Sequence, residues 1–172
     1  MARILQSLAL WLVIALSTVA VPGAAAADHF ALDRLDQPAL PVVLDDGKTL
    51  ADYGGRWVLL HFWATWCGPC VKEMRDLDRL NRRWRGKVAI FTVSIDEDGE
   101  LSVPPVLREH GIEMKTLLAR DTHASDRYWR RGVPVTYIID PRGRLVARAL
   151  GTREWDTAAA DRTLSALTGI TP

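Results

Sequence analysis

The sequence predicts a single α/β domain with a central mixed β-sheet flanked by helices on both faces. Apolar runs of strand length occur at 57–64 and 88–95, with an amphipathic helical pattern between them. A pair of strand patterns followed by a helix closes the chain. The first unit is a right-handed crossover between parallel strands, and the later hairpin adds antiparallel ones. The 172 residues suit one such domain behind an N-terminal segment.

Residues 1–27 have the pattern of a secretory signal peptide. Arg3 gives a positive charge, 4–21 is almost wholly apolar, and alanines end the segment. We expect export to the periplasm with cleavage, which leaves a domain over 28–172. An uncleaved membrane anchor is the alternative, because the apolar stretch is at the lower edge of a bilayer-spanning length. Both outcomes place the domain outside the cytoplasm.

The predicted domain begins with an N-terminal strand or hairpin extension. Residues 28–41 form a leader of mixed polarity, and 42–44 is a short strand followed by a turn at 45–47. A second turn at 53–56 precedes the run 57–64, which is apolar enough for a strand buried on both faces. That strand is the first strand of the predicted strand–helix–strand unit.

An amphipathic helix is predicted from Cys70 to Gly86. Apolar residues recur every three or four positions while charged residues fill the other faces, and Gly86 is the expected stop. The apolar positions are Val71, Met74, Leu77, Leu80 and Trp84. The arginines at 79, 82, 83 and 85 follow Asp76 and Asp78 on the same predicted helix, which predicts a solvated face and not a basic patch.

The segment after this helix alternates between strands and helices. It contains a strand at 88–95, a helix at 103–110 with two prolines in its first turn, and a short strand at 114–118. Residues 121–130 form a helix or turn. The acidic run after the first of these strands is a solvated loop, with a cation site as the alternative.

The C-terminal part is predicted to be a hairpin followed by a helix. A β-branched and aromatic strand at 135–140 turns through 141–143 into an antiparallel partner at 145–150. A helix over 155–167 closes the chain. The strand–helix–strand unit followed by this hairpin and helix predicts a mixed sheet.

The only two cysteines, Cys67 and Cys70, lie at the junction between the strand predicted at 57–64 and the helix that follows it. The first sulfur is placed at the positive end of a helix, where a thiolate is favoured. The second lies one turn inside, close enough to form a disulfide with the first. The pair predicts redox chemistry, with Cys67 as nucleophile and Cys70 as the resolving thiol.

Other uses of the cysteine pair fit less well. A structural disulfide closing so short a loop restrains the unfolded chain little. Structural zinc needs about four ligands, and the sequence has no second Cys-x-x-Cys to supply them. A Cu(I)-binding module stays open as an alternative, with Met74 near the thiolates, although Met74 also fits the apolar stripe. A peroxidase arrangement would need threonine where the chain has Ala64.

With these motifs, the sequence resembles the thioredoxin superfamily, and most closely its exported TlpA/ResA/CcmG-like thiol-disulfide oxidoreductases. The resemblance covers about 40–168 and rests on the segments 62–70 and 132–140 and on Glu73. It implies a thioredoxin fold in which Pro134 is cis and faces the cysteines. The backbone before that proline would then bind an extended substrate segment. The expected substrate-binding residues are Trp66, Gly68, Pro69, Val133 and Pro134.

Two residues are candidate proton carriers. Cytoplasmic thioredoxins have a buried acid six residues before the first cysteine, where this chain has His61. A neutral imidazole beneath the disulfide would take the proton of Cys70, whereas a core histidine without a catalytic part is the alternative. Glu73, one turn after Cys70, is the second candidate; its alternative is a solvated helix carboxylate.

These features predict an exported disulfide reductase with no cofactor beyond its own disulfide and no metal. The resemblance implies a membrane electron-relay protein of the DsbD/CcdA kind as reductant. Implied clients are the haem-binding cysteines of apocytochrome c or proteins of copper-site assembly. A disulfide-donating oxidant of the DsbA type is the enzymatic alternative. The 22 basic and 21 acidic side chains nearly balance, so no nucleic acid partner is expected, and we expect a monomer.

Overall fold

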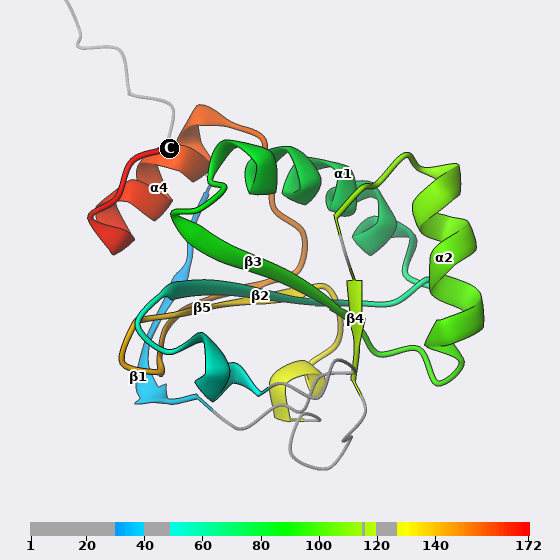
Figure 1. The fold of residues 1–172 in the computed structure, drawn as a ribbon, viewed down its shortest axis with the longest axis horizontal. Helices are drawn as coiled ribbons and strands as arrows, with labels where there is room; N and C mark the ends of the chain where they lie inside the picture. The colour runs from blue at the N-terminus through cyan, green and yellow to red at the C-terminus, as the bar shows by residue number, and fades with distance from the viewer. Residues whose placement is uncertain (1–29, 40–48, 115, 120–126) are drawn as a thin grey trace, which may run out of the picture.

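The computed structural model describes residues 30–39, 49–114, 116–119 and 127–172 (Figure 1). The predicted signal peptide, the predicted strand at 42–44 and its turn lie outside the described residues, as do residues 121–126. None of the described helices is long and apolar enough to span a membrane.

The described strands form one six-stranded mixed sheet in the order β1-β6-β5-β2-β3-β4. Strand β2 pairs in parallel with β3, as predicted, and antiparallel with β5, so it lies inside the sheet. Strand β4 extends the parallel side, and β6 and β1 extend the antiparallel side. The strands are β1 (Asp33–Pro38), β2 (Trp57–Trp63), β3 (Val88–Ser94), β4 (Thr116–Leu118), β5 (Val135–Ile139) and β6 (Arg144–Leu150).

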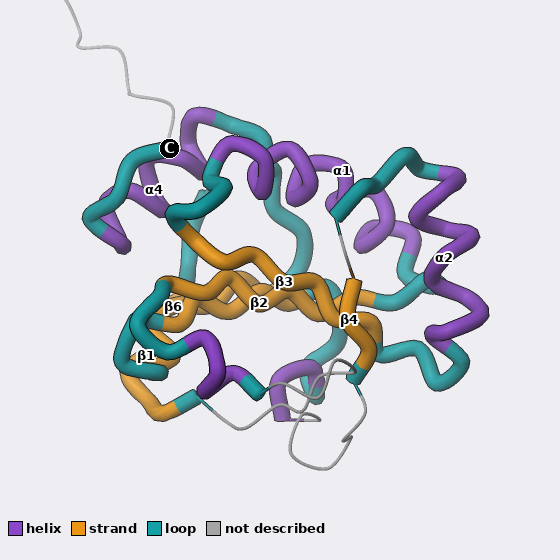
Figure 2. Tube along the Cα trace, viewed as in Figure 1, coloured by secondary structure: helices purple, strands orange, loops and turns teal. Residues whose placement is uncertain are grey.

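Helical segments lie on both sides of this sheet (Figure 2). Helices α1 (Gly68–Arg83) and α4 (Ala158–Thr168) cover one face, and α2 (Gly99–Glu109) flanks β4 (Figure 1). The 3₁₀ helix η1 (Leu50–Tyr53) and the helical stretch 127–129 lie across the opposite face. This confirms the predicted α/β fold.

Alternation along β2 divides the interior into two cores. Leu59 and Trp63 face the core under α1 and α4, whereas Leu60 and Phe62 face the opposite core. His61 therefore points to the same face as Leu59 and Trp63, the face covered by α1. Because an apolar core covers each face of β2, the sequence of this strand is a continuous hydrophobic run.

The N-terminal leader is partly a strand, which corrects the prediction for 28–41. Strand β1 pairs antiparallel with β6 at the edge of the sheet. Its side chains are mostly exposed, so the strand lacks the apolar alternation that would have identified it. Ion pairs from β6 hold it instead, with Arg148 on Asp33 at 2.8 Å and Arg144 on Asp36 at 2.5 Å.

Two helix starts also differ from the prediction. Helix α2 begins four residues earlier than expected, so Pro104 lies in the helix interior and not in its first turn. The proline is exposed, so solvent can bind the carbonyl that it leaves unpaired. Helix α4 begins later, after the cap Thr157, whose side chain accepts from the Ala160 amide. Trp155 consequently lies in the preceding loop.

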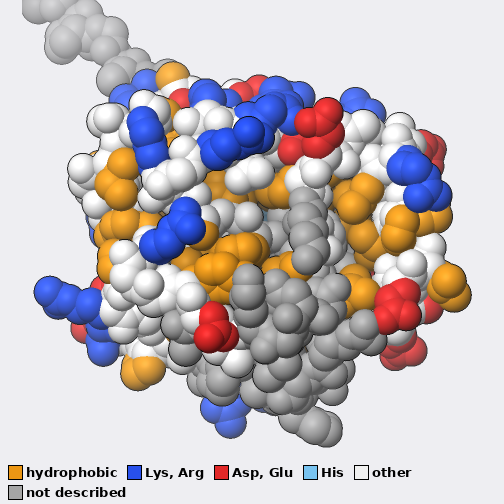
Figure 3. All heavy atoms as spheres, viewed as in Figure 1, with side chains coloured by type: hydrophobic (Ala, Val, Ile, Leu, Met, Phe, Trp, Pro, Cys, Tyr) orange, Lys and Arg blue, Asp and Glu red, His pale blue; other side chains and the backbone are white. Residues whose placement is uncertain are grey.

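The arginines of α1 are largely paired with carboxylates, as expected for a charged helix face. Arg79 and Arg83 both bind Asp156, and Arg83 also binds Asp161 of α4. Figure 3 shows basic side chains with acidic ones among them where α1 and α4 meet. These pairs connect the two helices and leave no purely basic patch at this position.

Candidate functional site

Three chain segments meet at one end of the sheet, where β2 and β3 finish and β5 begins. Strands β2 and β3 are parallel, so the residues after Trp63 and after Ser94 leave the sheet at the same end. Strand β5 is antiparallel to β2, so the residues before Val135 arrive at that end too. The cysteines and Pro134 lie at this end of the sheet, and open α/β sheets place ligand sites at such strand ends.

Cys67 and Cys70 form a disulfide at the start of α1, with Cα atoms 5.2 Å apart. Cys67 is the N-cap residue, and the Cys70 backbone N–H donates to its Sγ at 3.3 Å. Upon reduction the same N–H and the helix dipole stabilise a thiolate on Cys67. Cys67 is 9% exposed and Cys70 is fully buried, so Cys67 is the sulfur that solvent reaches.

The Val133–Pro134 peptide bond is cis, as the resemblance implied. Gly132, at φ +102, allows the backbone to turn into this bond. The Val133 carbonyl oxygen lies 3.8 Å from Cys67 Sγ, which brings the predicted substrate-binding backbone next to the disulfide. Trp66, beside Cys67, is 70% exposed and offers an apolar surface at the same point. Gly68 and Pro69 are exposed in the first turn of α1.

Glu73 is buried, not a solvated helix carboxylate. It is 3% exposed, and its Oε1 accepts hydrogen bonds from the Trp155 indole N–H and from the Arg153 backbone N–H at 3.1 Å. Its Oε2 has no hydrogen-bond partner among the described residues. Burial raises the pKa of Glu73 from 4.5 to about 7, although these N–H donors oppose the shift. Glu73 therefore exchanges a proton near neutral pH.

His61 lies in the core on the α1 face of the sheet. Its Nδ1 is 2.9 Å from Thr136 Oγ1 on the neighbouring strand, and Nε2 has no partner among the described residues. Complete burial lowers the pKa of His61 from 6.5 to about 3. The imidazole is therefore neutral at physiological pH, as expected, but it is a much weaker base than Glu73.

Asp96 is a site residue that the sequence reading assigned to a solvated loop. Its carboxylate accepts from the backbone N–H of Thr65 at 2.9 Å, from Thr65 Oγ1 at 2.6 Å and from Ser94 Oγ at 2.6 Å. Asp96 thus holds the turn that leads into Cys67. The predicted parallel pairing of β2 and β3 could have identified Asp96, because such pairing brings the residues that follow both strands to the same end of the sheet.

We expect Asp96→Ala to destabilise the fold by about 2 kcal/mol, because charge-assisted hydrogen bonds to Thr65 and Ser94 are lost. Reduction of a test disulfide should slow as well, since the turn before Cys67 loses its anchor. Urea unfolding and the exchange rate would measure the two effects. Glu97→Ala, an exposed neighbour, is the control. If both variants behave alike, Asp96 does not anchor the turn.

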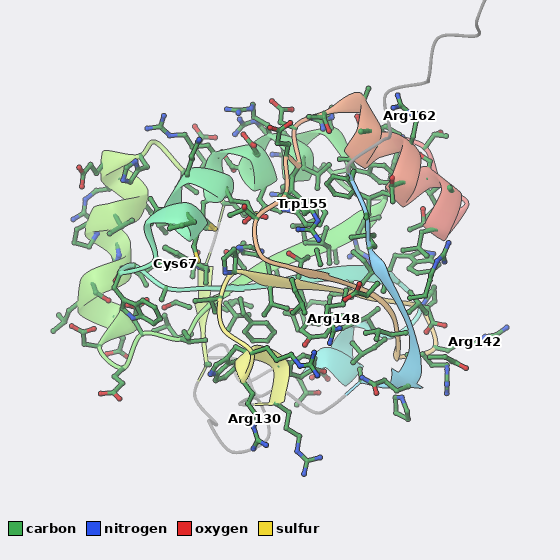
Figure 4. All side chains as sticks on the ribbon, turned by 180° about the vertical axis from the view of Figure 1, so that it is seen from behind. Cys67, Arg130, Arg142, Arg148, Trp155 and Arg162 are labelled. Atoms are coloured by element: carbon green, nitrogen blue, oxygen red, sulfur yellow. A yellow bond between two sulfur atoms is a disulfide. The ribbon has the colours of Figure 1, made fainter. Side chains whose placement is uncertain are left out.

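Two surface grooves flank the start of α1. A groove of about 1160 Å³ runs between α1 and the loop before α4, and Glu73, Pro69 and Arg153 contribute to its lining. A groove of about 460 Å³ lies on the other side of α1 and reaches His110 at the end of α2. Gly68 lines both grooves, so both adjoin the cysteine pair. In Figure 4, Cys67 lies near the beginning of α1 and Trp155 lies between α4 and the sheet.

The fold and site define a thioredoxin-like protein with a Cys-x-x-Cys disulfide at the start of its first long helix. The chain belongs to the AhpC/TSA family, whose sequence model matches residues 25–148. Two solved structures share the fold. A thiol:disulfide interchange protein DsbE from Chlorobium tepidum is 24% identical with TM-score 0.63, covering 79% of this chain and 98% of its own. The exposed lipoprotein thioredoxin Etrx1 of Streptococcus pneumoniae is 29% identical with TM-score 0.56, covering 77% and 99%.

Sequence relatives include two proteins of Bacillus subtilis. The thiol-disulfide oxidoreductase ResA is 32% identical over 115 residues, which is 64% of this chain and 64% of ResA. The thioredoxin-like protein YneN is 30% identical over 116 residues, which is 66% of this chain and 68% of YneN. The similarity thus spans somewhat less than two thirds of ResA's length.

Proposed function

We propose that this protein is a thiol–disulfide oxidoreductase that reduces disulfides in client proteins. The observation that carries the proposal is the Cys67–Cys70 disulfide at the start of α1, with the Val133 carbonyl 3.8 Å from Cys67 Sγ. A sulfur that becomes nucleophilic on reduction lies beside the backbone of Val133, which suits a disulfide in an extended peptide. The name of the relative ResA supports the same activity.

In the proposed reaction, the reduced protein passes two electrons to the client. The Cys67 thiolate attacks one client sulfur, the client S–S bond breaks, and the other client sulfur leaves as a thiolate. Cys70 then loses its proton and attacks Cys67 Sγ, which breaks the mixed disulfide and releases the second client thiolate. The protein is left with its Cys67–Cys70 disulfide.

We assign the proton of Cys70 to Glu73. Glu73 follows Cys70 by three residues, so the two lie on the same side of α1. A base is most effective when its pKa is near the working pH, which the pKa of about 7 satisfies for Glu73. His61, with a pKa of about 3, is assigned a packing and orienting part through Thr136.

We further propose that the protein works as a monomer in the periplasm, exported through residues 1–27 or held there by them. An oxidising compartment would oxidise the pair, so a membrane electron-relay protein of the DsbD/CcdA type is the proposed reductant. Clients of cytochrome c maturation or of copper-site assembly fit this role. The export pattern of the sequence and the oxidoreductase name of ResA support these assignments.

Cys70→Ser should trap clients as mixed disulfides on Cys67, because the resolving thiol is gone. The complexes would be isolated from cells under non-reducing conditions and identified by mass spectrometry. Cys67→Ser with Cys70→Ser is the control for other attachment. If only the control level of attachment appears, the protein does not attack client disulfides.

The reduction potential of the pair tests the direction of electron flow. A value near that of thioredoxin, roughly −270 mV, supports a reductase that needs an electron supply. A value near that of DsbA, roughly −120 mV, would make the protein a disulfide donor and overturn the proposed direction.

A further inference from the structure

We propose that the smaller groove beside the cysteine pair binds an acidic side chain of the client, next to the disulfide that is reduced. This inference rests on the proposed function and adds the chemical class of its substrate. The groove, which we call the basic groove, is lined by Thr65, Gly68, Val71, Lys72, Arg75 and His110. Its occupant would be a carboxylate on the peptide segment that lies across Cys67.

The basic groove carries positive charge without a carboxylate in its lining. Lys72 is exposed and forms no ion pair with any described residue, and it lines both grooves. Arg75 donates to the His110 carbonyl at 3.1 Å and lies 3.4 Å from His110 Nδ1, so it is held in place without being neutralised. A preplaced guanidinium beside an exposed ammonium group suits a carboxylate.

The larger groove, in contrast, has balanced charges in its lining. Its basic lining residues are matched by acidic ones, among them Asp76 and Asp156, which bind Arg79. Asp96 lies close to the basic groove, because it binds Thr65 of the lining. Its oxygens already accept hydrogen bonds from Thr65 and Ser94. It weakens the positive field but leaves Lys72 and Arg75 facing solvent.

The position of the basic groove connects recognition with reaction. Gly68, which follows Cys67, forms part of its lining, and Trp66 stands exposed beside it. A client segment held by the Val133 backbone at Cys67 would place a neighbouring side chain over Lys72. An acidic side chain gains from this placement, and a basic one is repelled, so charge there governs the rate of encounter.

The test uses two synthetic peptides, and each contains one intramolecular disulfide. In one peptide the disulfide is flanked by glutamates, and in the other it is flanked by lysines. Protein reduced beforehand is mixed with each peptide, and the peptide dithiol is followed by quenching and mass spectrometry. We expect faster reduction of the glutamate peptide. Lys72→Glu should slow reduction of the glutamate peptide about tenfold and accelerate reduction of the lysine peptide. At high salt, most of the difference in rate between the variant and the wild type should disappear.

Arg142→Glu is the matched control, because Arg142 lies at the opposite end of the molecule from Cys67 (Figure 4). It reverses the same charge and should change neither rate. The uncharged disulfide 4,4'-dithiodipyridine measures thiol reactivity alone and should react with Lys72→Glu as with the wild type.

Equal rates for the two peptides would overturn the acidic-client inference while leaving the proposed function intact. Equal effects of Lys72→Glu and Arg142→Glu would overturn it too, because the effect would then come from net charge. An equal slowing with dithiodipyridine would assign Lys72 to thiol reactivity instead of docking. Failure of the reduced wild type to react with any of the three disulfides would instead refute the proposed function.

Discussion

Glu73→Gln should slow the release of the client from the mixed disulfide by about 100-fold at pH 7, within the range that a general base contributes. Gln keeps the shape of the side chain and can still accept from Trp155, but it cannot take the proton of Cys70. Attack by Cys67 on the client should be much less affected. Rapid quenching would therefore show the mixed disulfide accumulating in the variant and not in the wild type.

The pH dependence separates this role from a packing role. In the wild type, the release rate should rise as pH passes about 7, because Glu73 must be ionised to accept a proton. In Glu73→Gln that rise should disappear. Glu154→Gln changes an exposed carboxylate on the neighbouring loop and is the control. An unchanged profile in Glu73→Gln would remove Glu73 from the proton path.

The same substitution should make the oxidised protein more stable at pH 8. The pKa of Glu73 is raised in the folded state, so the folded state holds a proton that the unfolded state has lost between pH 4.5 and about 7. Stability therefore falls by up to about 3 kcal/mol as pH rises through this window and stays low above it. Gln has no charge to bury. Urea unfolding at pH 5 and pH 8 should show this fall in the wild type and its loss in the variant.

Much of the site follows from local sequence patterns. The apolar run of β2, the amphipathic pattern of α1 and the cysteines between them predicted that Cys67 lies where a buried strand ends and a helix begins. A continuous apolar run identifies β2 and an apolar repeat of three to four residues identifies α1, so local sequence is enough to assign each element's type. The cis bond at Pro134 came from the family resemblance, because sequence alone leaves an ordinary trans proline equally open.

The residues that were missed act through distant contacts. Strand β1 is polar and is held by Arg144 and Arg148, more than a hundred residues away. Trp155 was assigned to a helix face, whereas it lies in a loop and binds Glu73 across 82 positions. Neither contact leaves a periodic signal, because each depends on how separate elements pack. The burial of Glu73, and with it the pKa near neutrality, was unpredictable for the same reason.

Trp155→Phe should move the pH dependence of client release to higher pH. The Trp155 indole N–H donates to Glu73 Oε1, and this hydrogen bond lowers the pKa of Glu73 against the effect of burial. Phenylalanine keeps an aromatic ring near Phe30, whose ring centre lies 4.8 Å from that of Trp155, but it has no donor. The pKa of Glu73 should then rise, so release slows at pH 7 and recovers at higher pH.

Trp155→Ala tests the packing part of the same residue. Trp155 is fully buried, and truncation of a buried tryptophan costs about 3–5 kcal/mol, so urea unfolding should show a much larger loss than in Trp155→Phe. Trp84→Phe is the matched control for the donor. Trp84 is also fully buried, and its indole donates to Asp161 at 2.8 Å, away from the cysteines. It should lose stability without moving the pH profile.

A double substitution distinguishes control of Glu73 from a general loosening of the site. If Trp155 acts through the Glu73 carboxylate, Trp155→Phe should leave the pH profile of Glu73→Gln unchanged, because no carboxylate remains to titrate. A loosened site would instead slow release in both backgrounds and at every pH. A shift of the profile that persists in the Glu73→Gln background would show that the indole acts on another titrating group.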